Sequence, residues 1–381
     1  MKILIISNLY PSTPKPKDSS GVMLLHNYAF AWSKEHEIEV INPHSYNLLS
    51  AREVKHNLIP KFELDGILVR NETVLRTPAG SLRVSKFEEI AKSESGEYDL
   101  MVACLPVGLE IAHFLNQRLG VPYIAYLHNT DFHRSGVSKG KLTTKYAKFL
   151  RAAKGLMYVS EKLQKQFERA LAPTQSGLFL PGAISQSWFA DQPMRTFNWK
   201  KRLRLITPAR LVKQKNIDTV LTALGQLTEL DFKYTIAGDG DHRVELEEHA
   251  SSNSALSKAV TFTGMLDPVQ LKKQIDKNDV LVMLSTNESF GLVYLEAMAR
   301  GCIPIGTIGE GIDGVIKHGE NGFLCSPDSQ SLKKLLLEIT DLPEAKLEKI
   351  SKSGIESAKN FTYESLADSF TKFTKSRLAD S

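Results

Sequence analysis

The fold of this chain is decided by Glu288-Ser-Phe-Gly-Leu-Val-Tyr-Leu-Glu296, a stretch with two carboxylates eight positions apart. It follows an apolar run at residues 279–284, which is short enough for a fully buried parallel strand. Good helix formers extend from Phe290 to Arg300, and Gly301 is a residue type that commonly ends a helix. A buried strand that leads directly into a helix is the repeating unit of a parallel α/β sheet.

The same stretch predicts a ligand site. The N–H groups near Phe290, Gly291 and Leu292 would open the helix without intrahelical partners, and such groups favour a bound anion such as a diphosphate. Glu288 in the loop and Glu296 on the helix are placed to accept hydrogen bonds from hydroxyls that flank the phosphate. A sugar and a ribose would supply those hydroxyls. The alternative is that one carboxylate complements the helix dipole and the other is an ordinary solvated side chain.

Length and composition are those of a globular enzyme. The chain has 381 residues, which is long for one core, so two domains are expected. Its hydrophobic and charged fractions, 42% and 24%, are ordinary for such proteins. The 3 cysteines lack metal-ligand or C-x-x-C spacing and indicate a reduced compartment. The first apolar run is too short for a signal peptide or a membrane span, so we expect a cytoplasmic protein.

Strand-like apolar runs alternate with helix-like segments along the whole chain, which predicts βαβ units and parallel sheets. A polar stretch at residues 189–201 interrupts the series and suits an interdomain linker. We therefore expect an α/β protein with two doubly wound domains and a ligand cleft at the carboxyl ends of their strands. The expected strands are residues 3–7, 38–41, 100–104, 123–126, 156–159 and 177–180, then 203–208, 234–237, 260–263, 280–284 and 303–306.

Two basic residues follow the first strand of the second series. Arg210 and Lys215 lie at a strand end, where a guanidinium and an ammonium group would neutralise a leaving diphosphate. Basic residues in a loop are more often simply solvated. Further along, Asp239 and Asp241 match a metal-binding D-x-D pattern, but so short a pattern arises readily by chance.

The first series offers two weaker candidates. Gly21 lies at the entrance of an expected helix, where it would let backbone N–H groups approach a phosphate or a sugar. His128 directly follows a strand, a good position for a functional histidine, although a lone histidine is more often structural.

A basic segment runs from Lys139 to Lys154 and contains six basic residues and no acidic one. Apolar residues recur in it at helical spacing, so one face would be apolar and the other cationic. Such helices usually pack on their own domain. The alternative is docking on anionic lipid, to which each basic residue contributes about 1 kcal/mol. Nucleic acid is not favoured as a partner, because no aromatic-interleaved basic motif accompanies the segment.

Taken together, these motifs resemble the family-4 retaining glycosyltransferases. The opening stretch is similar to their E-x7-E motif, and residues 297–306 continue the similarity. The segments at residues 126–131, 210–218 and 317–324 resemble the family's H-x-x-D, phosphate-binding and I-x-x-G-x-N-G-x-L segments. Two segments depart from the family: Ser20-Gly21 replaces a frequent glycine pair, and Leu180-Pro-Gly-Ala-Ile184 replaces Asn-Gly-Val-Asp.

The resemblance implies a GT-B fold with Rossmann-like domains at residues 1–195 and 196–360 and a C-terminal helix, residues 361–381, that crosses back to the first domain. It also implies a catalytic set in which Arg210 and Lys215 bind the diphosphate, Glu288 lies beside the donor sugar and His128 contacts that sugar near its reacting carbon. No metal and no cofactor are implied, and the turn at Asp239 is mainly structural in the family. The implied donor-binding residues are Gly21, Arg210, Lys215, Glu288, Phe290, Gly291, Leu292 and Glu296, the last holding the ribose.

The implied reaction transfers a sugar from a nucleotide diphosphate sugar, with UDP favoured, to an acceptor hydroxyl. The resemblance suggests front-face attack, with the leaving phosphate taking the acceptor's proton. A glycan or lipid-linked glycan of a bacterial surface polysaccharide is the favoured acceptor, with a peripheral position on the membrane, and a soluble acceptor is the alternative. Two other functions stay open: an epimerase or phosphorylase on the same fold, and a non-catalytic nucleotide- or glycan-binding subunit.

Overall fold

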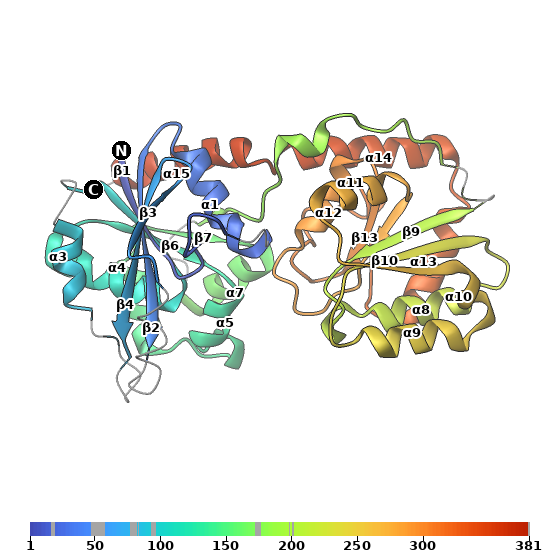
Figure 1. The fold of residues 1–381 in the computed structure, drawn as a ribbon, viewed down its shortest axis with the longest axis horizontal. Coiled ribbons are helices and arrows are strands. Elements are labelled where there is room, and N and C mark those ends of the chain that lie inside the picture. Colours follow the sequence, from blue (N-terminus) through green and yellow to red (C-terminus); the bar gives the residue numbers. More distant parts are fainter. Residues whose placement is uncertain are drawn as a thin grey trace. The chain divides into compact units, whose positions relative to one another are not determined.

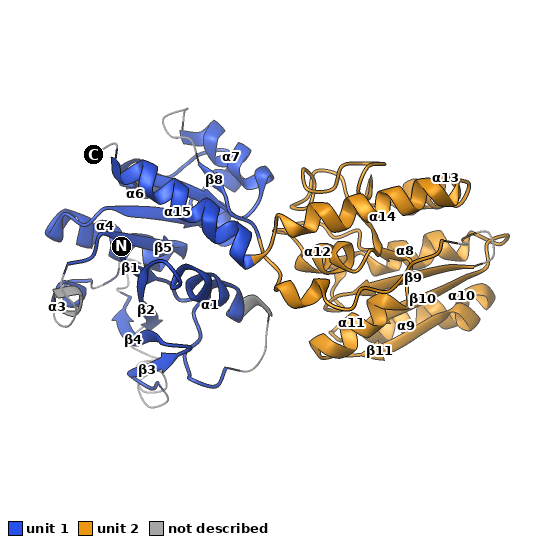
Figure 2. Ribbon diagram, turned by 90° about the horizontal axis from the view of Figure 1, so that it is seen from above, with its two compact units in different colours: residues 1–181, 363–381 blue, residues 182–362 orange. Residues whose placement is uncertain are grey.

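The computed structural model of this chain consists of two compact α/β units (Figures 1 and 2). Unit 1 comprises residues 1–181 and 363–381, and unit 2 comprises residues 182–362. The structure describes residues 1–16, 20–46, 58–76, 82, 84–92, 97–171, 177–197, 199 and 202–379.

Unit 1 is built on an eight-stranded sheet with the order β3-β4-β2-β1-β5-β6-β7-β8. All neighbouring strands are parallel except β3 and β4, which form an antiparallel hairpin at one edge. The central strands β5 and β6 are buried along their whole length, as expected for apolar strands covered on both faces. The strands are β1 (Lys2–Ile6), β2 (Glu37–Tyr46), β3 (Lys61–Leu64), β4 (Ile67–Leu75), β5 (Leu100–Cys104), β6 (Tyr123–Leu127), β7 (Gly155–Tyr158) and β8 (Leu178–Phe179).

The last helix of the chain belongs to unit 1, where it lies beside the first helix in both ribbon views. The rings of Trp32 and Phe370 stack with centroids 3.8 Å apart, and Tyr28 meets Tyr363 edge-on at 5.2 Å. These aromatic contacts fix the returning segment. The helices of unit 1 are α1 (Ser20–Trp32), α3 (Lys86–Lys92), α4 (Leu105–Leu119), α5 (Asn129–Arg134), the short 3-10 helix η1 (Val137–Lys139), α6 (Thr144–Ala152), α7 (Glu161–Leu171) and α15 (Tyr363–Ala379).

Unit 2 has a six-stranded sheet in the order β11-β10-β9-β12-β13-β14, and all its strands are parallel. Helices cover the sheet, and its core is aliphatic and aromatic. The strands are β9 (Leu203–Pro208), β10 (Phe232–Ala237), β11 (Val260–Gly264), β12 (Val280–Val282), β13 (Ile303–Thr307) and β14 (Phe323–Cys325). The helices are η2 (Gln186–Phe189), η3 (Lys213–Lys215), α8 (Ile217–Gly225), α9 (Arg243–Ser252), α10 (Ser254–Ala259), α11 (Pro268–Asp276), α12 (Leu292–Ala299), α13 (Ser329–Thr340) and α14 (Glu344–Lys359).

The chain enters unit 2 after residue 181, earlier than the predicted boundary between residues 195 and 196. Two buried or half-buried arginines explain the difference. Arg300, 1% exposed, pairs with Asp276 and donates to the carbonyls of Trp188, Ala190 and Asp191. Arg195 donates to the carbonyls of Ile275, Asn278 and Arg300. The irregular polar stretch expected to link the domains is therefore bonded to unit 2.

Candidate active site

Loops at the carboxyl ends of three adjacent strands of unit 2, β9, β12 and β13, are bonded to one another. The Thr286 N–H donates to the carbonyl of Gln214 at 2.9 Å, which joins the loops after β12 and β9. The Glu288 N–H donates to Oε2 of Glu310 at 3.0 Å, which joins the loops after β12 and β13. The carboxyl edge of a parallel sheet is where such folds bind ligands.

Lys215 and Glu288 form an ion pair in the middle of this edge. Each side chain is 16% exposed, so both charges are largely removed from water. Asn216 and Asn287, beside them, have φ of 57° and 59°, and asparagine tolerates this left-handed conformation better than most residues. The structure thus brings together a cation suited to a phosphate and a carboxylate suited to sugar hydroxyls, although the two are 73 positions apart in the sequence.

Helix α12 begins at Leu292, two residues later than the predicted start at Phe290. Gly291 precedes it with φ of 86°, and a Cβ there would lie 2.7 Å from the ring of Tyr294. Only glycine fits this entrance without strain. The Tyr294 N–H donates to the Gly291 carbonyl at 3.1 Å. The N–H groups before it, at the very start of the helix, fall outside the intrahelical bonding pattern and can donate to an anion. At the other end, Gly301 has φ of 66° and its N–H donates to the Met298 carbonyl, so the predicted stop is confirmed.

Glu296 lies on α12, and the residue as a whole is half-buried. Burial raises its pKa from 4.5 to about 7. Its side chain makes no hydrogen bond or ion pair with the residues that the structure describes. A desolvated carboxyl group without a protein partner is ready to bind hydroxyl groups of a ligand.

Arg210 lies in the same loop as Lys215 but does not join the ion pair. Its side chain is exposed, and within the described ranges it has no partner. The structure thus brings together two of the predicted site residues, Lys215 and Glu288, and leaves Arg210 as an unpaired guanidinium close to them in sequence.

The turn that contains Asp239 packs on the Arg210 loop. A Cβ at Gly238 would lie 1.9 Å from the Ala209 carbonyl oxygen, so the two backbones are in direct contact. Asp239 accepts the Gly240 N–H and pairs with Arg243 at 3.4 Å. Among the described residues, no group of three His, Cys, Asp or Glu side chains is placed to hold a metal ion.

In unit 1, His128 precedes helix α5 at the carboxyl end of β6. The backbone N–H of His128 donates to Oδ2 of Asp131 at 2.9 Å. The ring Nδ1 of His128 lies 3.2 Å from the Tyr126 carbonyl oxygen. A carbonyl can only accept, so the proton is assigned to Nδ1, which leaves Nε2 as an acceptor. Burial lowers the pKa of His128 to about 4 and raises that of Asp131 to about 7. His128 is therefore neutral at physiological pH.

Gly21 lies in the first turn of α1.

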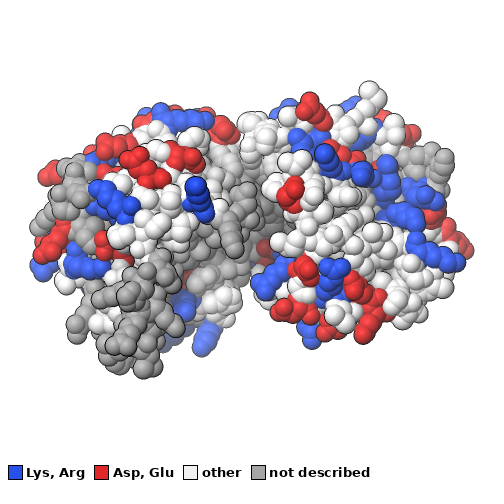
Figure 3. Space-filling view, viewed as in Figure 1, with Lys and Arg blue, Asp and Glu red and all other residues white. Residues whose placement is uncertain are grey.

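The basic segment forms a shorter helix than predicted, α6, which Figure 2 shows. Its apolar residues Tyr146, Ala147, Phe149 and Leu150 are buried in unit 1, so the apolar face packs on its own domain. Lys145 pairs with Glu110 at 2.8 Å. On the face of the two units that Figure 3 shows, basic and acidic side chains are interspersed. The exposed cations of the basic segment without a partner among the described residues are Lys139, Lys141, Lys148, Arg151 and Lys154.

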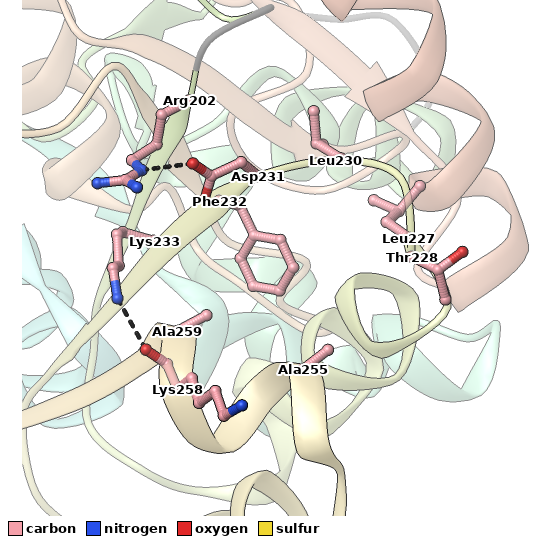
Figure 4. A pocket seen from close by; sticks show the side chains of 10 residues that line it. All are labelled: Arg202, Leu227, Thr228, Leu230, Asp231, Phe232, Lys233, Ala255, Lys258 and Ala259. Atoms are coloured by element: carbon pink, nitrogen blue, oxygen red, sulfur yellow. Dashed lines mark hydrogen bonds and ion pairs between the residues drawn. The ribbon is translucent and has the colours of Figure 1, made fainter.

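Figure 4 shows a pocket in unit 2 at the amino ends of β9 and β10, the opposite edge of the sheet from Lys215. Its polar side chains are largely satisfied by neighbours: Arg202 pairs with Asp231 at 2.8 Å, and Lys233 donates to the Lys258 carbonyl at 2.7 Å. None of the predicted site residues lines this pocket.

Glu310 joins the candidate site in the structure through its bond to Glu288 and was not predicted from the sequence. It follows the buried strand β13 and lies between two glycines, Gly309 and Gly311. A charged residue in a glycine-flanked turn at the carboxyl end of a buried strand is the signal that would have found it.

Comparisons with known proteins show which proteins this chain is similar to. Residues 192–357 match the family described as glycosyl transferases group 1. N-acetyl-alpha-D-glucosaminyl L-malate synthase from Bacillus anthracis is 26% identical over 335 residues, 85% of this chain and 84% of the relative. Alpha-monoglucosyldiacylglycerol synthase from Streptococcus pneumoniae is 37% identical over 99 residues, 26% of this chain and 22% of the relative.

Among solved structures, HepE from Anabaena in complex with UDP and glucose has a TM-score of 0.68 at 18% identity, covering 99% of this chain and 100% of that one. The likeness shows a GT-B fold, with two parallel-sheet α/β units. None of the described helices is long and apolar enough to cross a membrane.

Proposed function

We propose that this chain is a retaining glycosyltransferase that uses a nucleotide diphosphate sugar, UDP-linked in the first instance, because residues 192–357 match the family described as glycosyl transferases group 1. The observation that carries the proposal is the half-buried Lys215–Glu288 pair at the carboxyl edge of unit 2, before the N-terminus of α12. It combines a phosphate-binding cation, a hydroxyl-binding carboxylate and free helix N–H groups.

In the proposed reaction, the bond between the sugar's anomeric carbon and the diphosphate breaks while the acceptor oxygen attacks from the same face. The diphosphate accumulates negative charge, which Lys215, Arg210 and the N–H groups at the start of α12 stabilise. The leaving phosphate takes the proton of the acceptor hydroxyl. These positive groups would supply the neutralisation that a metal supplies elsewhere, so we propose that turnover needs no divalent cation.

The carboxylates have separate roles in this proposal. Glu288 accepts hydrogen bonds from the donor sugar once Lys215 turns to the phosphate, and Glu296 accepts them from the ribose. Neither is a nucleophile in this proposal, because the acceptor oxygen attacks the anomeric carbon directly and no covalent glycosyl-enzyme intermediate forms. His128 presents a neutral Nε2 acceptor, and we assign it to a hydroxyl of the donor sugar near the reacting carbon.

The relatives support a nucleotide-sugar donor and leave two acceptor classes. HepE was solved with UDP and glucose, which favours UDP. The names of the two curated relatives contain L-malate, a small acid, and diacylglycerol, a lipid. We propose a glycan or lipid-linked glycan acceptor in surface polysaccharide synthesis, because the exposed cations of α6 suit an anionic membrane. A soluble acceptor is the alternative.

The proposal is tested by incubating the protein with UDP-, GDP- and ADP-sugars, without acceptor and with a chelator. Slow release of nucleotide diphosphate from one donor, with the freed sugar first appearing as the donor's anomer in NMR spectra, would support a retaining transferase without a metal. An epimerase would convert the donor without releasing nucleotide. Binding without turnover under any condition would favour a non-catalytic subunit.

Glu296→Gln should change stability and donor affinity in opposite directions. The folded-state pKa, about 7, lies above the ordinary value of 4.5, so the folded protein loses stability as the pH rises from 4.5 through 7. Glutamine removes that loss, so the variant should be more stable than the wild type at pH 8 by about 1–3 kcal/mol, and no more stable at pH 4.5. Its affinity for the nucleotide diphosphate should fall about tenfold.

Urea unfolding at the two pH values and calorimetric titration of UDP at pH 8 measure both effects. A variant whose stability relative to the wild type does not depend on pH would contradict the assignment of a desolvated carboxyl group at Glu296.

Neutralising Lys148, Arg151 and Lys154 to glutamine should weaken binding to vesicles that contain anionic lipid. Each exposed cation contributes about 1 kcal/mol near such a surface, so the triple variant should lose on the order of 10²-fold in partitioning. A matched control removes the same charge from unit 2 at Lys277, Lys346 and Lys349, which are also exposed. Vesicle flotation measures the effect, and equal behaviour of the two triple variants would remove the membrane proposal.

A further inference from the structure

The Glu310 turn is built directly against the loop that carries Glu288. A Cβ at Gly311 would lie 2.1 Å from the Ser289 carbonyl oxygen, so the two backbones touch. Within the turn, the Gly309 N–H donates to Asp313 at 2.6 Å, and the Asp313 N–H donates to the Glu310 carbonyl at 2.9 Å. The carboxylate of Glu310 is thus presented from a closed, bonded turn.

Both the backbone and the side chain of Glu288 are held by bonds to neighbouring groups. Its N–H donates to Oε2 of Glu310, and its carboxylate pairs with Lys215 and accepts the Ser289 N–H at 3.2 Å. A hydrogen bond from an N–H to a carboxylate is charge-assisted and stronger than one between neutral groups. It also holds the left-handed turn at Asn287, which costs free energy for any residue other than glycine.

Donor binding removes one of these restraints. In the proposed function Lys215 turns to the diphosphate, so the carboxylate of Glu288 loses its cation when it must meet the sugar. The bond from the Glu288 N–H to Glu310 involves neither the lysine nor the carboxylate of Glu288. It is the restraint that can persist in the donor complex.

We propose that Glu310 is a positioning residue, which orients Glu288 toward the donor sugar by accepting its backbone N–H. This inference rests on the proposed role of Glu288. The bond requires an acceptor oxygen at position 310, not a negative charge. Glu310→Gln should therefore keep most of the activity, because the amide oxygen can accept the same N–H. Glu310→Ala should lower kcat about 10- to 100-fold with a smaller change in the KM for the donor, since a shift of about 1 Å in a residue that orients the substrate can cost on the order of 10²-fold.

A double-mutant cycle separates positioning from other roles. If Glu310 acts through Glu288, Glu310→Ala should have little further effect on kcat in the Glu288→Gln background. A full additional loss in that background, or equal losses for Glu310→Gln and Glu310→Ala, would overturn the proposal in favour of direct substrate binding or a general effect on folding. Glu320→Ala and Glu320→Gln, at an exposed glutamate in a neighbouring loop, are the controls.

A second readout does not depend on activity. Hydrogen exchange measured by mass spectrometry on peptides covering residues 286–291 should show a slowly exchanging Glu288 amide in the wild type and in Glu310→Gln, and faster exchange in Glu310→Ala. If the wild type turns over no donor, the proposed function fails, and the exchange pattern still decides whether Glu310 holds this backbone. Rapid exchange of the Glu288 amide in the wild type would overturn the inference whatever the activity.

Discussion

Lys215→Ala is expected to reduce donor turnover by about 10²–10³-fold, the loss typical when one preorganised charge is removed from a transition state. The same change should lower stability. It leaves the carboxylate of Glu288, 16% exposed, without its cation, and an uncompensated charge in such a place costs about 1–3 kcal/mol. Initial rates of nucleotide diphosphate release and urea unfolding measure the two effects.

The double variant Lys215→Ala, Glu288→Ala distinguishes the two effects. Removing both charges should restore much of the stability lost in the single variant, because no unpaired charge remains, whereas activity should stay low. Lys213→Ala is the matched control, since Lys213 is an exposed lysine in the same 3-10 helix and its side chain has no partner among the described residues. A Lys213→Ala variant as impaired as Lys215→Ala would show that the position of the charge is unimportant.

Gly291→Val is expected to abolish measurable turnover and to destabilise unit 2 by several kcal/mol. Valine at φ of 86° is strained by about 1–3 kcal/mol, and its Cβ would lie 2.7 Å from the buried ring of Tyr294. The shift needed to relieve this contact moves the start of α12, where the proposal places the diphosphate. Thermal unfolding and donor release measure the result.

Gly319→Ala separates backbone strain from the steric effect. Gly319 has φ of 75°, close to that of Gly291, but a Cβ there would meet nothing within 4 Å. This control should lose only about 1 kcal/mol of stability and keep its activity. Equal losses in the two variants would mean that strain alone, and not the entrance of α12, is responsible.

Much of the candidate site in unit 2 could be predicted from the sequence because its residues follow buried strands. Apolar runs placed β9, β12 and β13 in a parallel sheet, and parallel strands bring their carboxyl-end loops to one edge. The pairing of Lys215 with Glu288 could not be predicted, since it depends on the strand order β9-β12-β13 and on two left-handed asparagines. The bond between Glu288 and Glu310 depends on how two loops pack.

Three features of the fold escaped prediction for identifiable reasons. The β3–β4 hairpin turns at Asp65-Gly66, with φ of 50° and 78°, and this turn signal is not part of the pattern that indicates parallel strands. Strand β14, Phe323–Cys325, is too short for periodicity to detect. The predicted boundary between residues 195 and 196 followed from the irregular stretch at residues 189–201, which suits a linker, whereas unit 2 begins at residue 182. Bonds made by Arg195 and by Arg300, which is distant in sequence, fix this part of the chain to unit 2.

The basic segment shows how a sequence pattern can leave two interpretations open. The helical spacing of its apolar residues correctly indicated a buried face, and that face packs within unit 1. The cations on the other side follow from the same pattern, yet nothing in the spacing distinguishes a solvated surface from a lipid-binding one. Vesicle binding is therefore a separate question from the fold.

The central claim is that the Lys215–Glu288 edge of unit 2 binds the donor's diphosphate, and calorimetric titration of UDP tests it most directly. The wild type should bind UDP without a metal ion, and Lys215→Ala should bind it at least about tenfold more weakly. Lys233→Ala, which removes a lysine from the pocket at the opposite edge of the same sheet, should bind UDP like the wild type. Unchanged affinity in Lys215→Ala, or a loss confined to Lys233→Ala, would contradict the account.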